Sequence, residues 1–124
     1  MIELTVADGV AEVVLNAPDK LNALDPAGIA ELSDAYGEAE RMSQAGDVRA
    51  LVLRGEGRAF CAGRDISGVD PRDDDVIGYL GGLVQPLLER MAAFAAPTFA
   101  VAHGVSALGW SLMYTTEVPC CSTR

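Results

Sequence analysis

The segment Gly57–Ile66 (GRAFCAGRDI) has the residue types that let a protein backbone do chemistry. It follows an apolar run that ends at Leu53, so a strand leads into a glycine-bearing loop. Ala62 and Gly63 have almost no side chain, which lets a ligand oxygen approach the main chain closely. A turn that begins at Arg64 points free N–H groups outward, where they favour negative charge. Together with a second N–H donor, such a group forms an oxyanion hole.

A second glycine-bearing strand end, with the sequence HGVSALGW from His103 onward, is a natural source of the other donor. Nucleotide motifs fit less well. Gly55 and Gly57 resemble the start of the dinucleotide motif G-x-G-x-x-G, but Phe60 stands at the third glycine position and no Gly-Lys-Ser/Thr follows. The simpler alternative for the loop is that Gly63 only makes a turn.

Positive charge is concentrated around this segment. Five of the nine Lys and Arg residues lie between positions 49 and 72: Arg49, Arg54, Arg58, Arg64 and Arg72. The whole chain has a formal net charge of −9, which argues against nucleic acid as a partner. A locally basic loop on an acidic protein fits a small ligand that carries phosphate, and a set of solvated arginines is the alternative.

Cys61 offers a different chemistry, in which its thiol is a nucleophile and His103 is the base. A cysteine between Phe60 and Ala62 is more often a buried packing residue, and a lone histidine at a strand end is more often structural. The chain has three cysteines, two of them adjacent, which makes a poor disulfide framework. One histidine gives little support for zinc, so we expect no metal and a reduced, cytoplasmic setting.

The composition favours one domain over residues 1–124. Half of the 124 residues are apolar, which suffices for a hydrophobic core. No apolar run reaches the length that spans a membrane, and the N-terminus lacks the basic and apolar regions of a secretory signal. We therefore expect neither a membrane nor nucleic acid as a partner.

Alternating apolar residues predict strands over 2–6 and 10–15, joined by a tight turn at Asp8-Gly9. A loop over 17–24 leads to a helix with Asp25 as its N-cap and Pro26 at its first position. Apolar residues follow in this helix at helical spacing: Ile29, Leu32, Tyr36, Ala39 and Met42. A buried strand over 48–54 comes next.

A polar loop over 67–75 precedes a second helix. The acidic residues Asp73–Asp75 favour the N-terminus of this helix. Its apolar side is expected to hold Ile77, Leu80, Val84, Leu87, Leu88 and Met91. Pro86 should kink or restart this helix. A strand over 96–104 follows, and 109–117 is expected to begin another helix. This alternation of strands and helices predicts an α/β fold.

Three blocks, in this order and spacing, resemble the crotonase, or enoyl-CoA hydratase/isomerase, superfamily. They are VAEVVLNAPDKLNAL, VRALVLRGEGRAFCAGRDI and PTFAVAHGVSALG, and the middle block is highly specific. The resemblance implies a spiral of β-β-α units, incomplete here at the C-terminus, that binds acyl-CoA thioesters. Members of the superfamily hydrate 2-enoyl-CoA or move its double bond, and they stabilise a thioester enolate with two backbone N–H groups. No cofactor is implied, because the CoA thioester is the substrate.

The resemblance also implies particular site residues. The two oxyanion donors are the backbone N–H groups of Arg64 and of Trp110, which follows Gly109. Arg64 would act through its amide, and its side chain would matter little. The CoA-binding residues carried over are Lys20, Leu21, Ala23, Ala62, Gly63, Asp65 and Ile66. Lys20 and the arginines from Arg54 to Arg64 would lie near the CoA phosphates.

The sequence departs from the family pattern towards its end. Hydratases of the family have a glutamate where this chain has Met113, and Glu117 fits a counterpart only with a gap. A catalytically reduced protein that binds acyl-CoA is therefore the alternative to an enzyme, and a Cys61 thiol hydrolase is the third reading. The family forms trimers or hexamers, and an uncovered apolar helix face over Leu80–Met91 would itself favour self-association.

Overall fold

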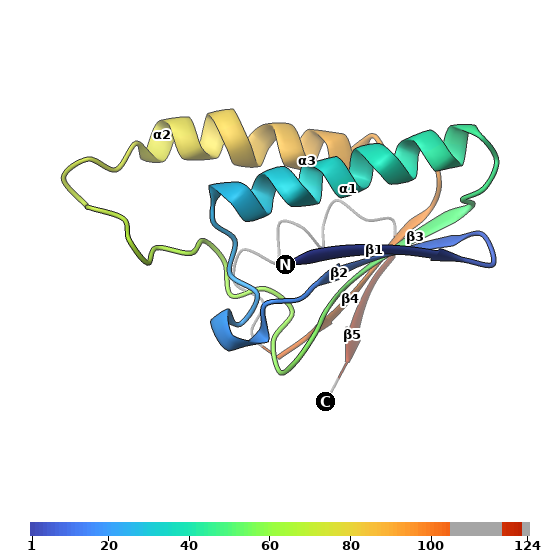
Figure 1. The fold of residues 1–124 in the computed structure, drawn as a ribbon, viewed down its shortest axis with the longest axis horizontal. Helices are drawn as coiled ribbons and strands as arrows, with labels where there is room; N and C mark the ends of the chain where they lie inside the picture. Colours follow the sequence, from blue (N-terminus) through green and yellow to red (C-terminus); the bar gives the residue numbers. More distant parts are fainter. Residues whose placement is uncertain (105–117, 123–124) are drawn as a thin grey trace.

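The computed structural model describes residues 1–104 in full and residues 118–122 as a strand. Its strands are β1 (Ile2–Ala7), β2 (Val10–Leu15), β3 (Ala50–Gly55), β4 (Thr98–His103) and β5 (Val118–Ser122). Its helical elements are the short turn η1 (Pro18–Lys20), then α1 (Pro26–Gln44), α2 (Val76–Tyr79), η2 (Leu80–Val84) and α3 (Gln85–Ala92). Figure 1 shows the helices above a twisted sheet.

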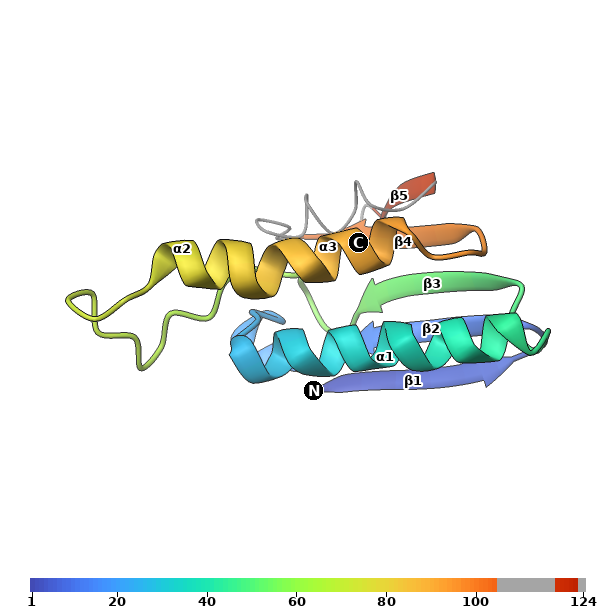
Figure 2. The same cartoon turned by 90° about the horizontal axis from the view of Figure 1, so that it is seen from above.

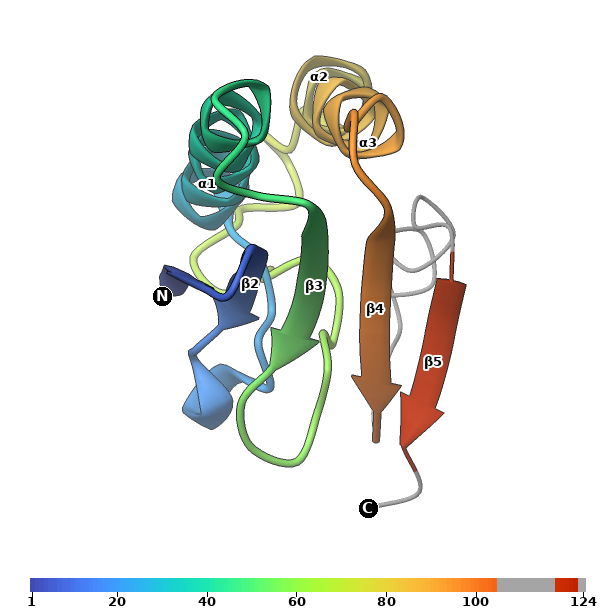
Figure 3. The same ribbon diagram turned by 90° about the vertical axis from the view of Figure 1, so that its right-hand side faces the viewer.

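The strands form one sheet in the order β1-β2-β3-β4-β5. β1 and β2 are antiparallel, and every later neighbour is parallel. A parallel pair needs a crossover, which α1 supplies between β2 and β3 and α2 to α3 supply between β3 and β4. Both crossovers lie on the same face of the sheet and side by side (Figures 2 and 3). The α/β architecture predicted from the sequence is confirmed.

The hairpin between β1 and β2 turns at the predicted dipeptide. Asp8 has φ 53° and Gly9 has φ 79°, the two positive values that a tight hairpin turn of this twist requires. The turn sets the register, in which Ala7 pairs with Val10 and Ile2 with Leu15. β2 thereby enters the sheet interior, where Val13, Val14 and Leu15 are all buried.

Helix α1 begins where its capping residue predicts. The Asp25 carboxylate accepts a hydrogen bond from the Gly28 N–H at 2.7 Å, and Pro26 opens the first turn. Its predicted apolar face packs on the sheet, with Ile29, Leu32 and Tyr36 at most 3% exposed. The Tyr36 ring meets the edge of Phe94, at a centroid separation of 6.0 Å, which joins α1 to the end of the second crossover.

The second crossover helix is interrupted, as Pro86 predicts. Between α2 and α3 the chain makes a wider π-type turn in which the Gln85 N–H bonds to the Leu80 carbonyl. Pro86 has no N–H to donate, so the ordinary four-residue pattern cannot pass through this point. Helix α3 starts again at Gln85, with Pro86 in its first turn.

The predicted apolar side of this helix is partly wrong. Val84, Leu87 and Met91 are buried as expected, but Ile77 is 85% exposed and Leu80 is 50% exposed. The π-type turn holds an extra residue, so residues before it lose the helical phase of those after it. The expectation of an uncovered face over Leu80–Met91 therefore holds only for its beginning.

Strand β5, with the sequence VPCCS, has no counterpart among the elements predicted from the sequence, and it contains Pro119, which has no N–H for a strand ladder. It pairs with β4 as the outermost strand of the described sheet, where a missing N–H is tolerated. The expected helix over 109–117 lies outside the described residues.

Tyr36 supplies a test of the core. Its hydroxyl is buried and has no hydrogen-bond partner within the described residues, and burial raises the pKa of the phenol. Tyr36→Phe should raise the free energy of unfolding of the complete protein by about 1 kcal/mol, measured by urea denaturation. Tyr36→Leu, which also loses the contact with Phe94, should lower it by about 2 kcal/mol. A less stable phenylalanine variant would contradict this account.

Candidate functional site

The loops that follow β2 and β3 lie side by side at one end of the sheet (Figure 1). Three backbone hydrogen bonds join residues 21–24 to residues 62–65. The Ala62 N–H donates to the Leu21 carbonyl at 2.9 Å, Leu24 donates to Gly63 at 2.8 Å, and Asp65 donates to Leu24 at 2.8 Å. The structure thus brings together the two segments that the sequence assigned to CoA.

Asn22 joins the same two loops from inside, and the sequence analysis missed it. Its side chain is fully buried. The carboxamide oxygen accepts from the Ala17 N–H at 2.8 Å, and the amide nitrogen donates to the carbonyls of Glu56 at 2.9 Å and Ala59 at 2.8 Å. Its φ of 57° lies in the left-handed region, which asparagine tolerates better than most residues. From the sequence, Asn22 is only one residue of the loop over 17–24.

The bridge between Leu24 and Arg64 sets the direction of the Arg64 amide. In a parallel bridge, one residue bonds to the two neighbours of its partner, and here Leu24 bonds to Gly63 and Asp65. The N–H and C=O of Arg64 itself therefore point away from residues 21–24. No acceptor among the described residues takes a hydrogen bond from the Arg64 N–H. The predicted second donor, Trp110, and Gly109 lie outside the described residues.

The Arg64 side chain has its own partners, contrary to the expectation that it would matter little. Its guanidinium makes a two-pronged ion pair with Asp74, at 2.7 and 2.9 Å. Its central carbon also lies 4.1 Å from the centre of the Tyr79 ring, in a cation–π contact. The side-chain hydrogen bond from Arg64 holds the pKa of the Asp74 carboxyl below its usual range, so Asp74 is ionised at neutral pH. From the sequence, Asp74 is expected only to favour a helix N-terminus, together with Asp73 and Asp75, and no role is predicted for Tyr79.

Lys20 and Asp65, both predicted to bind CoA, form an ion pair at 3.3 Å. Asp65 also accepts from the hydroxyl and the N–H of Ser67, at 2.6 and 2.9 Å. These hydrogen bonds, with the Ser67 hydroxyl first, lower the pKa of Asp65. The Lys20 side chain remains half exposed, Ile66 is exposed, and Ala23 is half-buried. A small pocket of about 160 Å³ has Lys20 and Ala23 in its wall.

The other arginines of the basic segment are mostly neutralised by nearby acceptors. Arg54 pairs with Glu12 at 2.9 Å and with Glu56 at 2.6 Å. Arg72 pairs with Asp70, and Arg49 donates to the Asp8 carbonyl. Within the described part of the chain, only Arg58 of the five has no ion pair or side-chain hydrogen bond. The expectation that the arginines jointly hold phosphate is therefore not supported by their contacts, because four of them are occupied.

Cys61 is a packing residue, as its neighbours in the sequence suggest. It is fully buried in the core. Burial raises the pKa of its thiol, and a hydrogen bond from the Gly63 backbone acts in the opposite direction. His103 ends β4, where its Nε2 donates to the Gly57 carbonyl at 2.7 Å. A buried protonated thiol and an occupied imidazole do not favour the thiol hydrolase.

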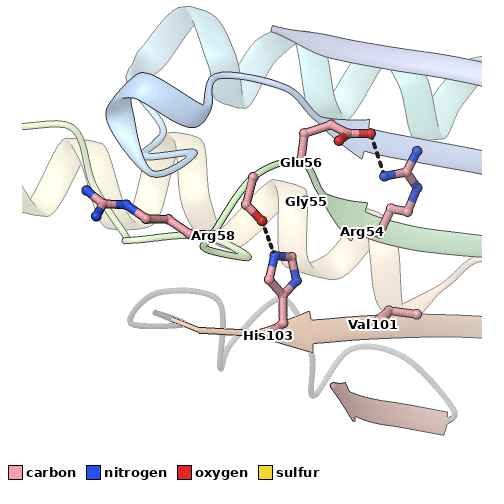
Figure 4. A pocket seen from close by; sticks show the side chains of 7 residues that line it. Arg54, Gly55, Glu56, Arg58, Val101 and His103 are labelled. Carbon is pink, nitrogen blue, oxygen red and sulfur yellow. Dashed lines mark hydrogen bonds and ion pairs between the residues drawn. The ribbon is translucent and has the colours of Figure 1, made fainter. Parts of the chain in front are cut away.

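A pocket of about 540 Å³ opens beside His103, at the end of the sheet where β3 and β4 finish (Figure 4). The described residues that line it are Arg54, Gly55, Glu56, Gly57, Arg58, Val101 and His103. Two of these, Arg54 and Arg58, are among the arginines expected near the CoA phosphates, and the other residues carried over for CoA binding do not line the pocket. Gly57 and Arg58 begin the segment that carries the Arg64 amide, so the pocket adjoins the start of that segment.

The family model described as Enoyl-CoA hydratase/isomerase matches residues 5–122 of this sequence. The chain belongs to this family. It is similar to a protein of Rhodobacter capsulatus named "Probable enoyl-CoA hydratase", with 32% identity over 106 residues that cover 86% of this chain and 39% of that protein. It is also similar to 1,2-epoxyphenylacetyl-CoA isomerase of Escherichia coli, with 33% identity over 106 residues that cover 82% of this chain and 39% of that protein.

The fold of the chain is also similar to that of a solved enoyl-CoA hydratase structure. The crystal structure of an enoyl-CoA hydratase from Mycobacterium avium subsp. paratuberculosis matches with a TM-score of 0.80 and 29% identity, over 97% of this chain and 46% of that one. The crotonase-like fold predicted from the sequence is confirmed. This enoyl-CoA hydratase/isomerase family chain spans about two fifths of the length of the two curated relatives, and so carries part of that fold.

Two further properties concern only the described residues. No helix among them combines the length and the apolar character needed to cross a membrane. No group of three or more potential metal-ligating side chains gathers in the same part of the chain.

The Asn22 contacts predict a large loss of stability on substitution. Asn22→Ala leaves three main-chain groups without their partner, so the free energy of unfolding should fall by about 3 kcal/mol in urea denaturation of the complete protein. Asn16→Ala is the matched control, because Asn16 makes one exposed hydrogen bond, to Glu3, and its loss should cost about 0.5 kcal/mol or less. Equal effects of the two substitutions would contradict the role of Asn22.

Burial of Cys61 predicts slow alkylation. Because a raised pKa lowers the thiolate fraction at pH 7 to 8, iodoacetamide should modify Cys61 at least about 100-fold more slowly in the folded complete protein than in denaturant. Mass spectrometry of the peptide that contains Cys61 separates it from Cys120 and Cys121. Equal rates in the two conditions would return the thiol to the list of candidate nucleophiles.

Proposed function

We propose that the complete protein binds an acyl-CoA thioester and stabilises its enolate with two backbone N–H groups, as an enoyl-CoA hydratase or isomerase. Family membership supports the ligand class. The observation that carries the mechanism is the Arg64 amide, which the bridge to Leu24 turns away from residues 21–24 and which has no acceptor among the described residues.

The chemistry accounts for the use of backbone donors. Negative charge gathers on the thioester oxygen only as the reaction proceeds, so fixed N–H groups stabilise the transition state more than the substrate. Loss of one such donor typically lowers kcat by about 100- to 1,000-fold. The Arg64 amide is held by hydrogen bonds on both sides, at Gly63 and Asp65, and so needs little rearrangement when charge develops.

Two reactions fit the same enolate. In hydration, water adds hydroxide at C3 of a 2-enoyl thioester and a proton at C2. In isomerisation, a proton leaves C2 of a 3-enoyl thioester and a proton returns at C4. The family description names both a hydratase and an isomerase of enoyl-CoA, so the proposal covers both reactions.

The loop residues give CoA a place beside this amide. Leu21 and Ala23 run alongside Ala62–Asp65, and the half-exposed Lys20 side chain lies at the edge of this pair of segments. The pairing of Lys20 with Asp65 holds the Lys20 ammonium near the loop. We assign the CoA-binding role to these residues on this juxtaposition.

The proposal includes self-association as a trimer or hexamer in a reducing compartment, the cytoplasm. The exposed apolar side chains at Ile66, Val76, Ile77 and Leu80 support an oligomer, and the unpaired Cys61 thiol supports a reducing setting. Sedimentation of the complete protein as a monomer would refute the first part.

The test uses the complete protein with a panel of 2-enoyl-CoA and 3-enoyl-CoA substrates of different chain lengths. Loss of the conjugated thioester absorbance is expected for hydration, and its gain for isomerisation. In D₂O, deuterium should also enter C2 of a saturated acyl-CoA, because enolate formation removes and returns that proton.

The alternatives give different results. Binding of CoA esters in calorimetry without turnover or exchange would favour the catalytically reduced acyl-CoA-binding protein. Absence of binding would overturn both readings. Retention of turnover in Cys61→Ala is expected, because the buried thiol takes no part.

A further inference from the structure

The two partners of the Arg64 side chain lie further along the same connection between β3 and β4, beyond the site loop that holds Arg64. Asp74 precedes helix α2, and Tyr79 is the last residue of that helix. Neighbouring Asp75 caps the helix by accepting from the Gly78 N–H at 2.9 Å. The position of Asp74 is therefore set by the start of the helix, and its ion pair with Arg64 holds the Arg64 side chain in place.

The contact is stronger in kind than an ordinary surface ion pair. Both prongs of the guanidinium meet the two carboxylate oxygens of Asp74, which fixes the plane of the side chain as well as its distance. The Arg64 and Asp74 side chains are only 24% and 17% exposed, so water and salt screen the pair less than an exposed one. The Tyr79 ring, itself 6% exposed, covers the guanidinium.

The same tyrosine reaches Leu24, the loop residue that is bridged to Arg64. Its hydroxyl donates to the Leu24 carbonyl at 3.5 Å, and that carbonyl also accepts from the Asp65 N–H at 2.8 Å. Arg64 is thus held through its main chain by Leu24 and through its side chain by Asp74 and Tyr79. Three contacts from two directions leave its amide little freedom to rotate.

We propose that Asp74 and Tyr79 are positioning residues that hold the Arg64 backbone N–H in the direction needed to receive an enolate oxygen. Asp74 and Tyr79 contact the Arg64 side chain and act on the Arg64 backbone through it. This inference rests on the proposed function for its catalytic consequence, but the restraint on the loop can be measured without a substrate.

A matched ion pair in the same loop provides the control. Asp70 and Arg72 pair at 3.1 Å, the Arg72 side chain is 89% exposed, and among the described residues neither makes a hydrogen bond or ion pair with residues 62–65. Asp70→Asn removes the same charge from the same segment as Asp74→Asn. A general effect of charge or of loop stability would appear in both variants. An effect of positioning Arg64 would appear only in Asp74→Asn.

The experiment compares wild type, Asp74→Asn, Asp70→Asn, Arg64→Lys, Arg64→Ala and the double variant R64A/D74N, all as the complete protein. Hydrogen exchange, read by mass spectrometry on peptides covering residues 60–67 without ligand, reports the bonds from Ala62 and Asp65 to the Leu21–Leu24 segment. Asp74→Asn should speed this exchange about 10-fold. Arg64→Lys, which keeps the charge but loses the fork and the stacked plane, should do the same. Asp70→Asn should leave the exchange unchanged.

Kinetics with the enoyl-CoA substrate then separates positioning from binding. Asp74→Asn and Tyr79→Leu should lower kcat about 10-fold with KM within twofold, because the amide is needed most in the transition state. Asp74→Asn should have no further effect in the Arg64→Ala background, since it acts through that side chain.

Equal behaviour of Asp74→Asn and Asp70→Asn in both measurements would overturn the inference. A rise in KM with kcat unchanged would also overturn it, because the pair would then serve binding. If the wild type turns over no substrate, the proposed function fails, and the exchange arm alone decides whether Asp74 restrains the loop. Should Asp74→Asn fail to fold, Arg64→Lys carries the same test with the charge retained.

Discussion

The Asn22 carboxamide joins the two loops of the candidate site, and the arrangement of the rest of the site depends on it. A single fully buried side chain satisfies the N–H of Ala17 and the carbonyls of Glu56 and Ala59. Neither loop can move away without leaving a buried polar group unpaired, which costs more than an ordinary hydrogen bond contributes. The bridge between Leu24 and Arg64 forms on loops that are already held together.

The parallel sheet explains why these two loops meet at all. β2 and β3 run in the same direction with Leu15 beside Gly55, so the segments that follow them leave the sheet at the same edge. Ligands of α/β proteins are commonly bound beyond the carboxyl ends of such strands. The helices occupy one face and so leave this edge to the loops (Figure 3). The position of the site is thus a consequence of strand direction, before any particular side chain is considered.

Most of the positively charged side chains near the site form ion pairs with acidic side chains close by. The sequence concentrates arginines near the loop, which suggests a surface for phosphate, yet Arg54 and Arg64 are neutralised by acidic neighbours from other segments. The Arg64 side chain therefore has a structural role, while the backbone N–H of the same residue points away from residues 21–24. Among the described residues, Arg58 is the one arginine of the basic segment without an ion pair or side-chain hydrogen bond, and Lys20 is half exposed beside Asp65. The chain can therefore be acidic overall and still place positive charge beside the site.

The sequence by itself determined what depends on a few neighbouring residues. The Asp8-Gly9 turn, the Asp25 cap and the break at Pro86 follow from local backbone preferences, and the order of the motifs identified the family. The phase of the apolar residues before Pro86 could not be read in the same way, since the π-type turn shifts it.

Only the tertiary structure decided which distant groups satisfy the polar side chains of the site. Asn22 bonds to carbonyls 34 and 37 residues away, and the partners of Arg64 are Asp74, just before helix α2, and Tyr79, at the end of that helix. A sequence shows that such a side chain needs partners but not which ones the packing supplies. The reason is physical: backbone preference acts over a few residues, whereas hydrogen bonds and ion pairs act only across the short distances that the completed fold creates.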